Sequence, residues 1–96
     1  EESIIKIITY YKAQILLEIN DKKGFDEEIN KLLAYEGLWS LLGHELRGHY
    51  YIKNKKYDLA KKDFNKIFNE QISSNGLKSR AREMLQKLSL YDEKNT

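Results

Sequence analysis

The residues with the clearest chemical potential lie together between positions 44 and 49. His44, Glu45 and His49 are of types that bind zinc or transfer protons when a helix presents them on one side. Each residue of an α-helix is rotated by about 100° from the last, so residues four apart differ by about 40° and residues five apart by about 140°. The two histidines are five apart. A regular helix therefore directs them too differently for both to bind one metal ion.

The same string, HELRGH, resembles the HExxGH motif of the dipeptidyl peptidase III family, whose helix accommodates the extra residue. That resemblance implies a zinc peptidase with a third ligand in a downstream Glu-rich motif and a far larger chain. Neither is present here. We keep a zinc peptidase as an alternative function, and our preferred interpretation treats His44 and His49 as ordinary helix-surface residues with no metal and no cofactor.

Other catalytic patterns are absent from the sequence. The five glycines form neither a GxGxxG nor a GxxxxGK arrangement, and there is no cysteine. The serines have no legible pairing with a His and an Asp, and two histidines leave few candidates for a general base. The sequence therefore favours a protein that is not an enzyme.

Composition predicts one small folded domain. Of 96 residues, 41% are hydrophobic, which is enough for a core, and no proline interrupts any segment. The net charge is +2, and the lysines are interleaved with acidic residues, so we expect no nucleic-acid partner. Basic residues on the last helix leave nucleic acid or anionic lipid as an alternative, against the preferred interpretation of a solvated face. They are Lys78, Arg80, Arg82 and Lys87.

Apolar residues recur at helical spacing in five segments. We expect helices over about 3–20, from about 25, over 38–52, 57–71 and 77–90, with a polar turn at 21–24 and a disordered tail at 92–96. The first helix is apolar well around its circumference, starting from a stripe of Ile4, Ile8, Tyr11, Ile15 and Ile19. Such a helix needs neighbours on more than one side. It is central, or an upstream part of the protein covers it, or it forms a homodimer.

The helices repeat as hairpins. Phe25 and Tyr57 each open the second helix of a pair, and they lie 32 residues apart (57 − 25), near the ~34-residue tetratricopeptide period. One hairpin cannot bury both of its faces, so hairpins stack. The sequence predicts an all-α fold of about five helices.

The second hairpin resembles the tetratricopeptide-repeat family. Gly48, Tyr51, Ala60 and Phe64 fall at the spacing of that family's small, aromatic, small and aromatic positions, and Ala81 supplies a small residue in the last helix. Glycine inside a helix costs about 1 kcal/mol relative to alanine, so Gly48 also indicates a closely packed neighbour. The resemblance implies a short right-handed solenoid over residues 1–91.

The first hairpin departs from this pattern. Leu16 and Glu28 occupy positions where the family has small residues, and His44 replaces a large apolar one. The resemblance is therefore carried by the second hairpin and the last helix.

More narrowly, residues 41–88 look like the C-terminal part of the periplasmic domain of membrane-anchored ancillary subunits of the bacterial SecYEG translocon. The carrying segments are 45–48, 60–64 and 79–85. The resemblance implies an inner-membrane anchor upstream, a periplasmic location and a scaffold role in secretion or envelope assembly, with a cytoplasmic location as the alternative. The chain opens with Glu1, which predicts a fragment of a longer protein.

Placed on the repeat register, eight residues face the concave side, the family's usual peptide groove. They are Tyr10, Ala13, Leu17, Leu42, Glu45, His49, Lys78 and Arg82. A part apolar, part charged surface suits an extended or helical peptide. We expect a non-catalytic protein–protein interaction module, with a self-associating helical domain as the alternative.

Overall fold

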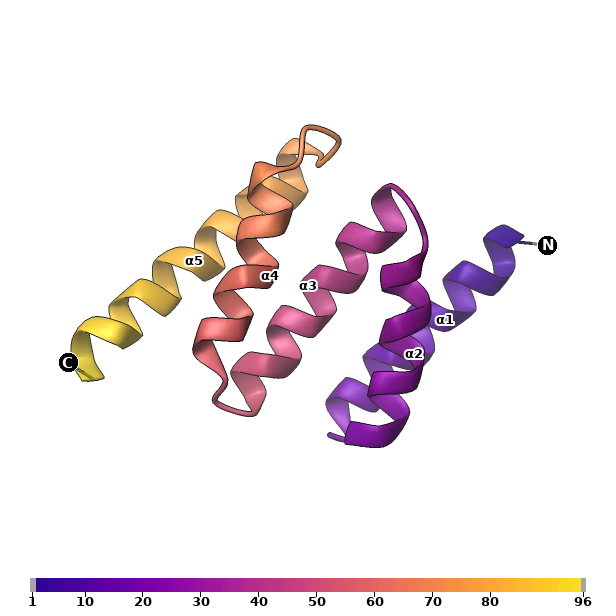
Figure 1. The fold of residues 1–96 in the computed structure, drawn as a ribbon, viewed down its shortest axis with the longest axis horizontal. Coiled ribbons are helices and arrows are strands. Elements are labelled where there is room, and N and C mark those ends of the chain that lie inside the picture. The colour runs from indigo at the N-terminus through magenta and orange to yellow at the C-terminus, as the bar shows by residue number, and fades with distance from the viewer. Residues whose placement is uncertain (1, 96) are drawn as a thin grey trace.

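The computed structural model describes the backbone of residues 2–95 and the side chains of residues 2–91, and it is built from α-helices (Figure 1). No strand occurs over the described range. The helices are α1 (Glu2–Glu18), α2 (Lys22–Ala34), α3 (Leu38–Lys53), α4 (Tyr57–Asn69) and α5 (Asn75–Asn95). The predicted all-α fold of helical hairpins is confirmed.

Helices that follow one another in the chain pack side by side. The pairs α1–α2 and α3–α4 form hairpins, α5 packs on α4, and α3 contacts both helices of the first hairpin. In Figure 1, α2 and α4 lie nearer the viewer than α1 and α5. The described chain spans 48 × 31 × 17 Å, and its two ends lie at opposite ends of the long axis. Helix α3 therefore occupies the middle of the array.

Two buried clusters hold the helices together, and α3 contributes to both. The first cluster joins α1 and α2 to one side of α3, and the second joins α4 and α5 to the other. The first contains Ala13, Phe25, Ile29, Leu32, Leu46 and Tyr50. The second contains Leu41, Ala60, Phe64, Ile67, Leu77, Ala81 and Leu88. Each cluster is the apolar stripe of amphipathic helices turned inward.

The turns of the two hairpins are alike. Asn20 and Lys55 each adopt a left-handed backbone, with φ of 55° and 62°. The next residue, Asp21 or Lys56, donates its backbone N–H to the carbonyl five positions earlier, at 3.0 and 2.7 Å. These equivalent residues lie 35 apart (55 − 20), so the structural repeat is 35 residues long.

A 35-residue repeat corrects the predicted equivalence of Phe25 and Tyr57, which are 32 apart. Phe25 corresponds to Ala60 (25 + 35), and both are fully buried. Tyr57 is the first residue of α4, and its ring centre lies 4.1 Å from that of Tyr91. The aromatic side chains after the two turns therefore have different roles.

The same repeat corrects the assignment of the small-residue position in the first hairpin. Gly48 corresponds to Ala13 (48 − 35), which is fully buried, and not to Leu16. The first hairpin therefore also has a small, buried residue at this position.

Two predicted boundaries are wrong. Helix α2 begins at Lys22 and not near Phe25, because the Asp21 carboxylate caps it by accepting from the Gly24 N–H at 3.0 Å. Helix α5 continues past the predicted end at Leu90, so residues 92–95 of the expected tail are helical, and Thr96 lies outside the described residues. No Gly or Pro follows Leu90 to stop the helix.

Candidate functional site

Helices α1, α3 and α5 share one face of the array, and an ion pair connects two of them there. Arg80 of α5 donates from Nε and Nη2 to the Glu45 carboxylate of α3, at 2.8 and 3.2 Å. The Glu45 side chain is 11% exposed, whereas that of Arg80 is 56% exposed. A mostly buried carboxylate thus holds a guanidinium at the surface.

Tyr10 brings α1 to the same face. Its ring meets that of Trp39 edge-on, with ring centres 6.3 Å apart. Burial raises the pKa of the Tyr10 phenol, and the nearby negative charge of Glu45 raises it further. Arg80 lowers the pKa of Tyr10, which places all three groups within electrostatic reach of one another.

His49 lies one turn beyond Glu45 on α3. Its ring meets Phe64 edge-on, with centres 5.3 Å apart. Burial lowers the pKa of His49, and the positive charges of Arg80 and Lys87 lower it further, while Glu45 opposes them. The imidazole is therefore neutral at pH 7. We call Tyr10, Glu45, His49 and Arg80 the α1/α3/α5 face.

The structure brings three of the eight predicted groove residues together: Tyr10, Glu45 and His49. Ala13 is fully buried in the contact between helices, so no ligand can reach it. Leu17 and Leu42 are half-buried and pack against the two clusters. The apolar part of the predicted groove is thus largely used by the protein's own core.

Lys78 and Arg82 are not brought to this face. The Arg82 guanidinium lies 5.4 Å from the ring centre of Phe68, on α4. Arg80 lies two residues from each of them and so points about 160–200° away around the helix. Arg80 was missed as a site residue because the α5 register was not fixed by the sequence, although its pattern of Leu77, Ala81 and Leu88 marks the buried side.

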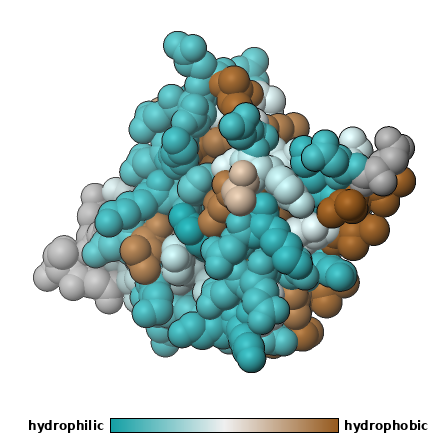
Figure 2. Space-filling model, turned by 45° about the vertical axis from the view of Figure 1, so that its right-hand side comes forward, coloured by the Kyte–Doolittle hydropathy of each residue, from teal (hydrophilic) through white to brown (hydrophobic). Residues whose placement is uncertain are grey.

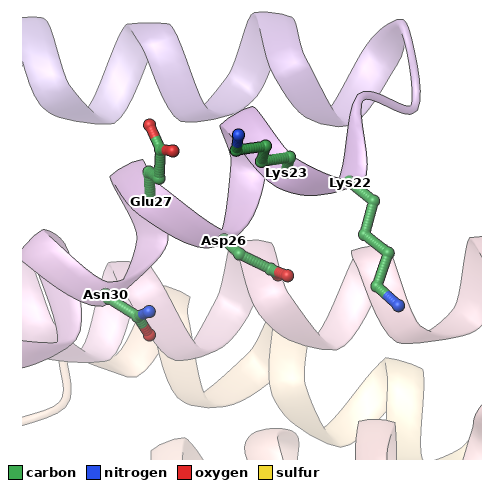
Figure 3. A pocket seen from close by; sticks show the side chains of 5 residues that line it. All are labelled: Lys22, Lys23, Asp26, Glu27 and Asn30. Carbon is green, nitrogen blue, oxygen red and sulfur yellow. The ribbon is translucent and has the colours of Figure 1, made fainter.

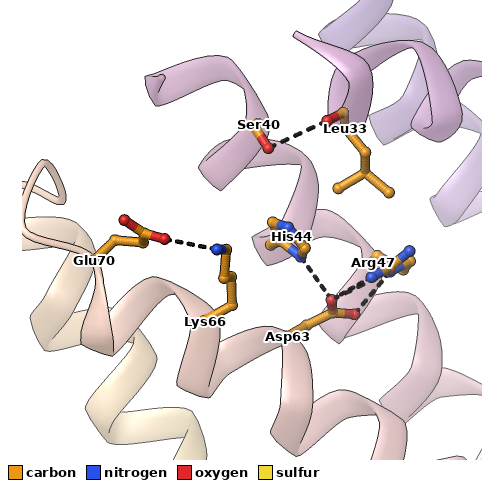
Figure 4. A network of polar contacts seen from close by, with 7 residues as sticks. All are labelled: Leu33, Ser40, His44, Arg47, Asp63, Lys66 and Glu70. Atoms are coloured by element: carbon orange, nitrogen blue, oxygen red, sulfur yellow. Dashed lines mark hydrogen bonds and ion pairs between the residues drawn. The ribbon is translucent and has the colours of Figure 1, made fainter. Parts of the chain in front are cut away.

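The other side of α3 carries a second polar cluster, which the sequence did not predict (Figure 4). Asp63 of α4 is 2% exposed. Its carboxylate lies 2.8 Å from Nδ1 of His44 and accepts from Nε and Nη2 of Arg47 at 2.8–3.2 Å. All three side chains point into the α3–α4 contact, so this cluster joins the two helices.

This arrangement separates the two histidines of the HELRGH string. His44 turns to Asp63, whereas His49 stands beside Phe64. Over the residues whose side chains are described, no group of three His, Cys, Asp or Glu side chains is placed to hold a metal ion.

The surface also has shallow hollows away from the α1/α3/α5 face. One of about 390 Å³ follows α2 and is lined by Lys22, Lys23, Asp26, Glu27 and Asn30 (Figure 3). These side chains are exposed, carry both charges and point to different sides of the helix. Ligand sites need convergent polar groups in an apolar cleft, and this hollow does not provide them.

Comparisons of this chain with protein-family models, with curated proteins and with solved structures found no match. Of the helices over residues 2–95, none has the length and apolar character needed to cross a membrane.

Proposed function

We propose that this chain is a non-catalytic, tetratricopeptide-like interaction module that binds a protein or peptide on its α1/α3/α5 face. One observation carries the proposal. Three helices that are not consecutive in the chain place Tyr10, His49 and the Glu45–Arg80 pair on one surface. A surface assembled from alternate helices of stacked hairpins is the usual binding surface of helical-repeat proteins.

The chemistry of this face favours a peptide ligand. The Glu45 carboxylate accepts hydrogen bonds from Nε and Nη2 of Arg80, whose guanidinium has five N–H donors in all. The remaining donors are on a side chain that is 56% exposed, and they suit carbonyl or carboxylate oxygens. Tyr10 and the neutral imidazole of His49 add a flat, partly apolar surface beside this donor. Such a combination fits a peptide backbone with an acidic or C-terminal group.

The proposed setting is the periplasmic side of a bacterial inner membrane, with an anchor outside these residues. Only the resemblance of residues 41–88 to periplasmic translocon subunits supports this setting. In it, the ligand is a nascent secreted chain or a component of an envelope complex.

Photo-crosslinking from defined positions tests the proposal in cells. A photoreactive phenylalanine analogue replaces His49 on the proposed face or, as a matched control, exposed Asn65 on α4. We expect a discrete crosslinked product from position 49 that is lost in Arg80→Glu and unaffected by Arg82→Glu. Equal products from both positions, or none from position 49, would contradict the proposal.

A further inference from the structure

The outward side of α1 carries most of the exposed large hydrophobic side chains among the described residues. Seven large side chains along 4–19 are 42–65% exposed. They are Ile4, Ile5, Ile7, Ile8, Tyr11, Ile15 and Ile19. The side of α1 that packs on the rest of the protein has Thr9 and Ala13 at its centre. In Figure 2, brown hydrophobic atoms gather along the right-hand edge, where this turn of the view brings α1.

This surface is too large to be incidental. The largest apolar patch of an ordinary monomer is about 300–600 Å². Seven side chains that are about half exposed come to roughly 600–700 Å², close to the ~800 Å² that each partner gives to a standard stable interface. At about 25 cal/mol per Å², covering the patch is strongly favourable. The area matches what one protein partner must cover.

The spacing of the central stripe is symmetric, which identifies the partner. Ile4, Ile8, Tyr11, Ile15 and Ile19 lie near one line along the helix. If a second α1 runs antiparallel across it, residues whose numbers sum to 23 lie at the same level along the pair (4 + 19, 8 + 15), and every isoleucine of the stripe then meets another isoleucine. The twofold axis passes between levels 11 and 12, so the two Tyr11 side chains lie on either side of it, offset by about 1.5 Å along the helices. The stripe is complementary to itself, as a twofold interface requires.

The charges of α1 favour a protein partner over a lipid surface. Helices that lie on membranes carry excess Lys and Arg on a free polar face. Within α1, Lys6 and Lys12 are balanced by Glu2 and Glu18. The side opposite the stripe is also not free, because it is packed against α2 and α3.

We propose that the protein forms a twofold homodimer through antiparallel contact of α1 with α1 of a second copy, centred on Tyr11. No residue of this interface belongs to the α1/α3/α5 face, although the two surfaces adjoin where the Tyr11 ring meets that of Tyr10 edge-on, with centres 5.8 Å apart. Two copies joined in this way present two ligand-binding faces.

Sedimentation equilibrium across a wide concentration range tests the dimer. We expect the wild type to be dimeric and Ile8→Asp to raise the dissociation constant at least 100-fold. Ile72→Asp is the matched control, because Ile72 is similarly exposed at 62% but lies in the α4–α5 connection. It should leave the dimer intact. Circular dichroism spectra verify that both variants keep their helices.

Cysteine crosslinking tests the antiparallel register, since the chain has no cysteine of its own. We expect Tyr11→Cys to form a disulfide-linked dimer on mild oxidation and Ile4→Cys alone to form little. A mixture of Ile4→Cys with Ile19→Cys should give the mixed dimer, and Ile72→Cys should give none. Crosslinking of Ile4→Cys to itself would contradict the antiparallel register.

Two outcomes would overturn the dimer. One is a wild-type monomer at every concentration. The other is a monomer that binds vesicles of phosphatidylcholine and phosphatidylglycerol through the stripe, as judged by loss of binding in Ile8→Asp but not in Ile72→Asp. Neither outcome bears on crosslinking from position 49, so this inference and the proposed function fail separately.

Discussion

The ring of Phe64 occupies the space that Gly48 leaves free on α3. A Cβ atom on Gly48 would lie 2.7 Å from both Cε2 and Cζ of that ring. Phe64 is fully buried, so its ring has no room to withdraw. In the first hairpin, the equivalent positions hold Ala13 and Ile29, 35 residues earlier in each case. The second hairpin thus pairs glycine with phenylalanine. The first pairs alanine, which is larger than glycine, with isoleucine, which is smaller than phenylalanine.

We expect Gly48→Ala to destabilise the protein by about 1–3 kcal/mol, because the overlap with Phe64 outweighs the ~1 kcal/mol gain in helix propensity. Urea denaturation measures the change. Gly76→Ala is the control, because its Cβ would meet nothing nearer than 3.9 Å and should leave the stability unchanged or higher by up to ~1 kcal/mol. Equal effects at both sites would show that the contact with Phe64 is unimportant.

A second substitution should relieve the first. Phe64→Ile alone leaves a cavity, and we expect it to cost about 1–3 kcal/mol. Combined with Gly48→Ala, it recreates the Ala–Ile pair of the first hairpin, so the double variant should be more stable than the sum of the single effects predicts, by about 1 kcal/mol or more. A double-mutant cycle in urea measures this coupling. Strict additivity would mean that the two hairpins are not equivalent at these positions.

Removing the Asp63 carboxylate should loosen the second hairpin. Deleting one partner of a buried ion pair costs about 3–5 kcal/mol. Arg47 is 30% exposed and can regain water, so we expect a smaller loss of about 2–3 kcal/mol for Asp63→Ala. Asp58→Ala on the exposed side of α4 is the control and should cost no more than ~1 kcal/mol through the helix dipole. Thermal and urea denaturation should both show a larger loss of stability for Asp63→Ala than for Asp58→Ala.

The burial of His49 predicts an acid-sensitive stability. Its folded-state pKa lies below the ordinary value of 6.5, so the unfolded chain takes up the proton first as the pH falls. The free energy of unfolding should therefore decrease as the pH falls below about 6.5, and this decrease should cease below the folded-state pKa. The groups that face His49 are Glu45, Arg80 and Lys87.

The measurement compares wild type with His49→Gln in urea at pH 7.5 and pH 5.5. The variant lacks the titrating imidazole, so it should lose less stability over this interval than the wild type. Identical losses would show that His49 is not the group responsible.

The sequence was sufficient to predict the helices, because apolar residues at helical spacing occur in all five of them. It was weaker at helix ends. Gly24 was taken as part of a terminating turn, but the capping carboxylate of Asp21 lets the helix start before it. The repeat length was misjudged because Phe25 and Tyr57 both follow a turn and are both aromatic, although only Phe25 is fully buried.

The site was only partly predictable. Glu45 and His49 were correctly placed on one face, since both lie on α3 and one turn apart. Arg80 was missed in favour of Lys78 and Arg82, and a shift of two residues turns a helix by about 200°. The buried pattern of Leu77, Ala81 and Leu88 was the available signal for the correct side of α5.

The cluster around Asp63 depends on the pairing of α3 with α4. Asp63 lies 19 residues from His44 and 16 from Arg47 along the chain, and helical periodicity within one segment does not reveal contacts between segments.

That cluster also restricts how α4 can slide along α3. Apolar side chains tolerate displacement by one helical turn, since every turn of a stripe offers a similar surface. Asp63 has no such freedom. Moving it by one turn, about 5.4 Å, would break its contacts with His44 and Arg47 and leave its buried carboxylate unpaired, which is costly. The single carboxylate of Asp63 thus fixes the register of α4 on α3. It selects one alignment of the hairpin from several that the apolar contacts alone would allow.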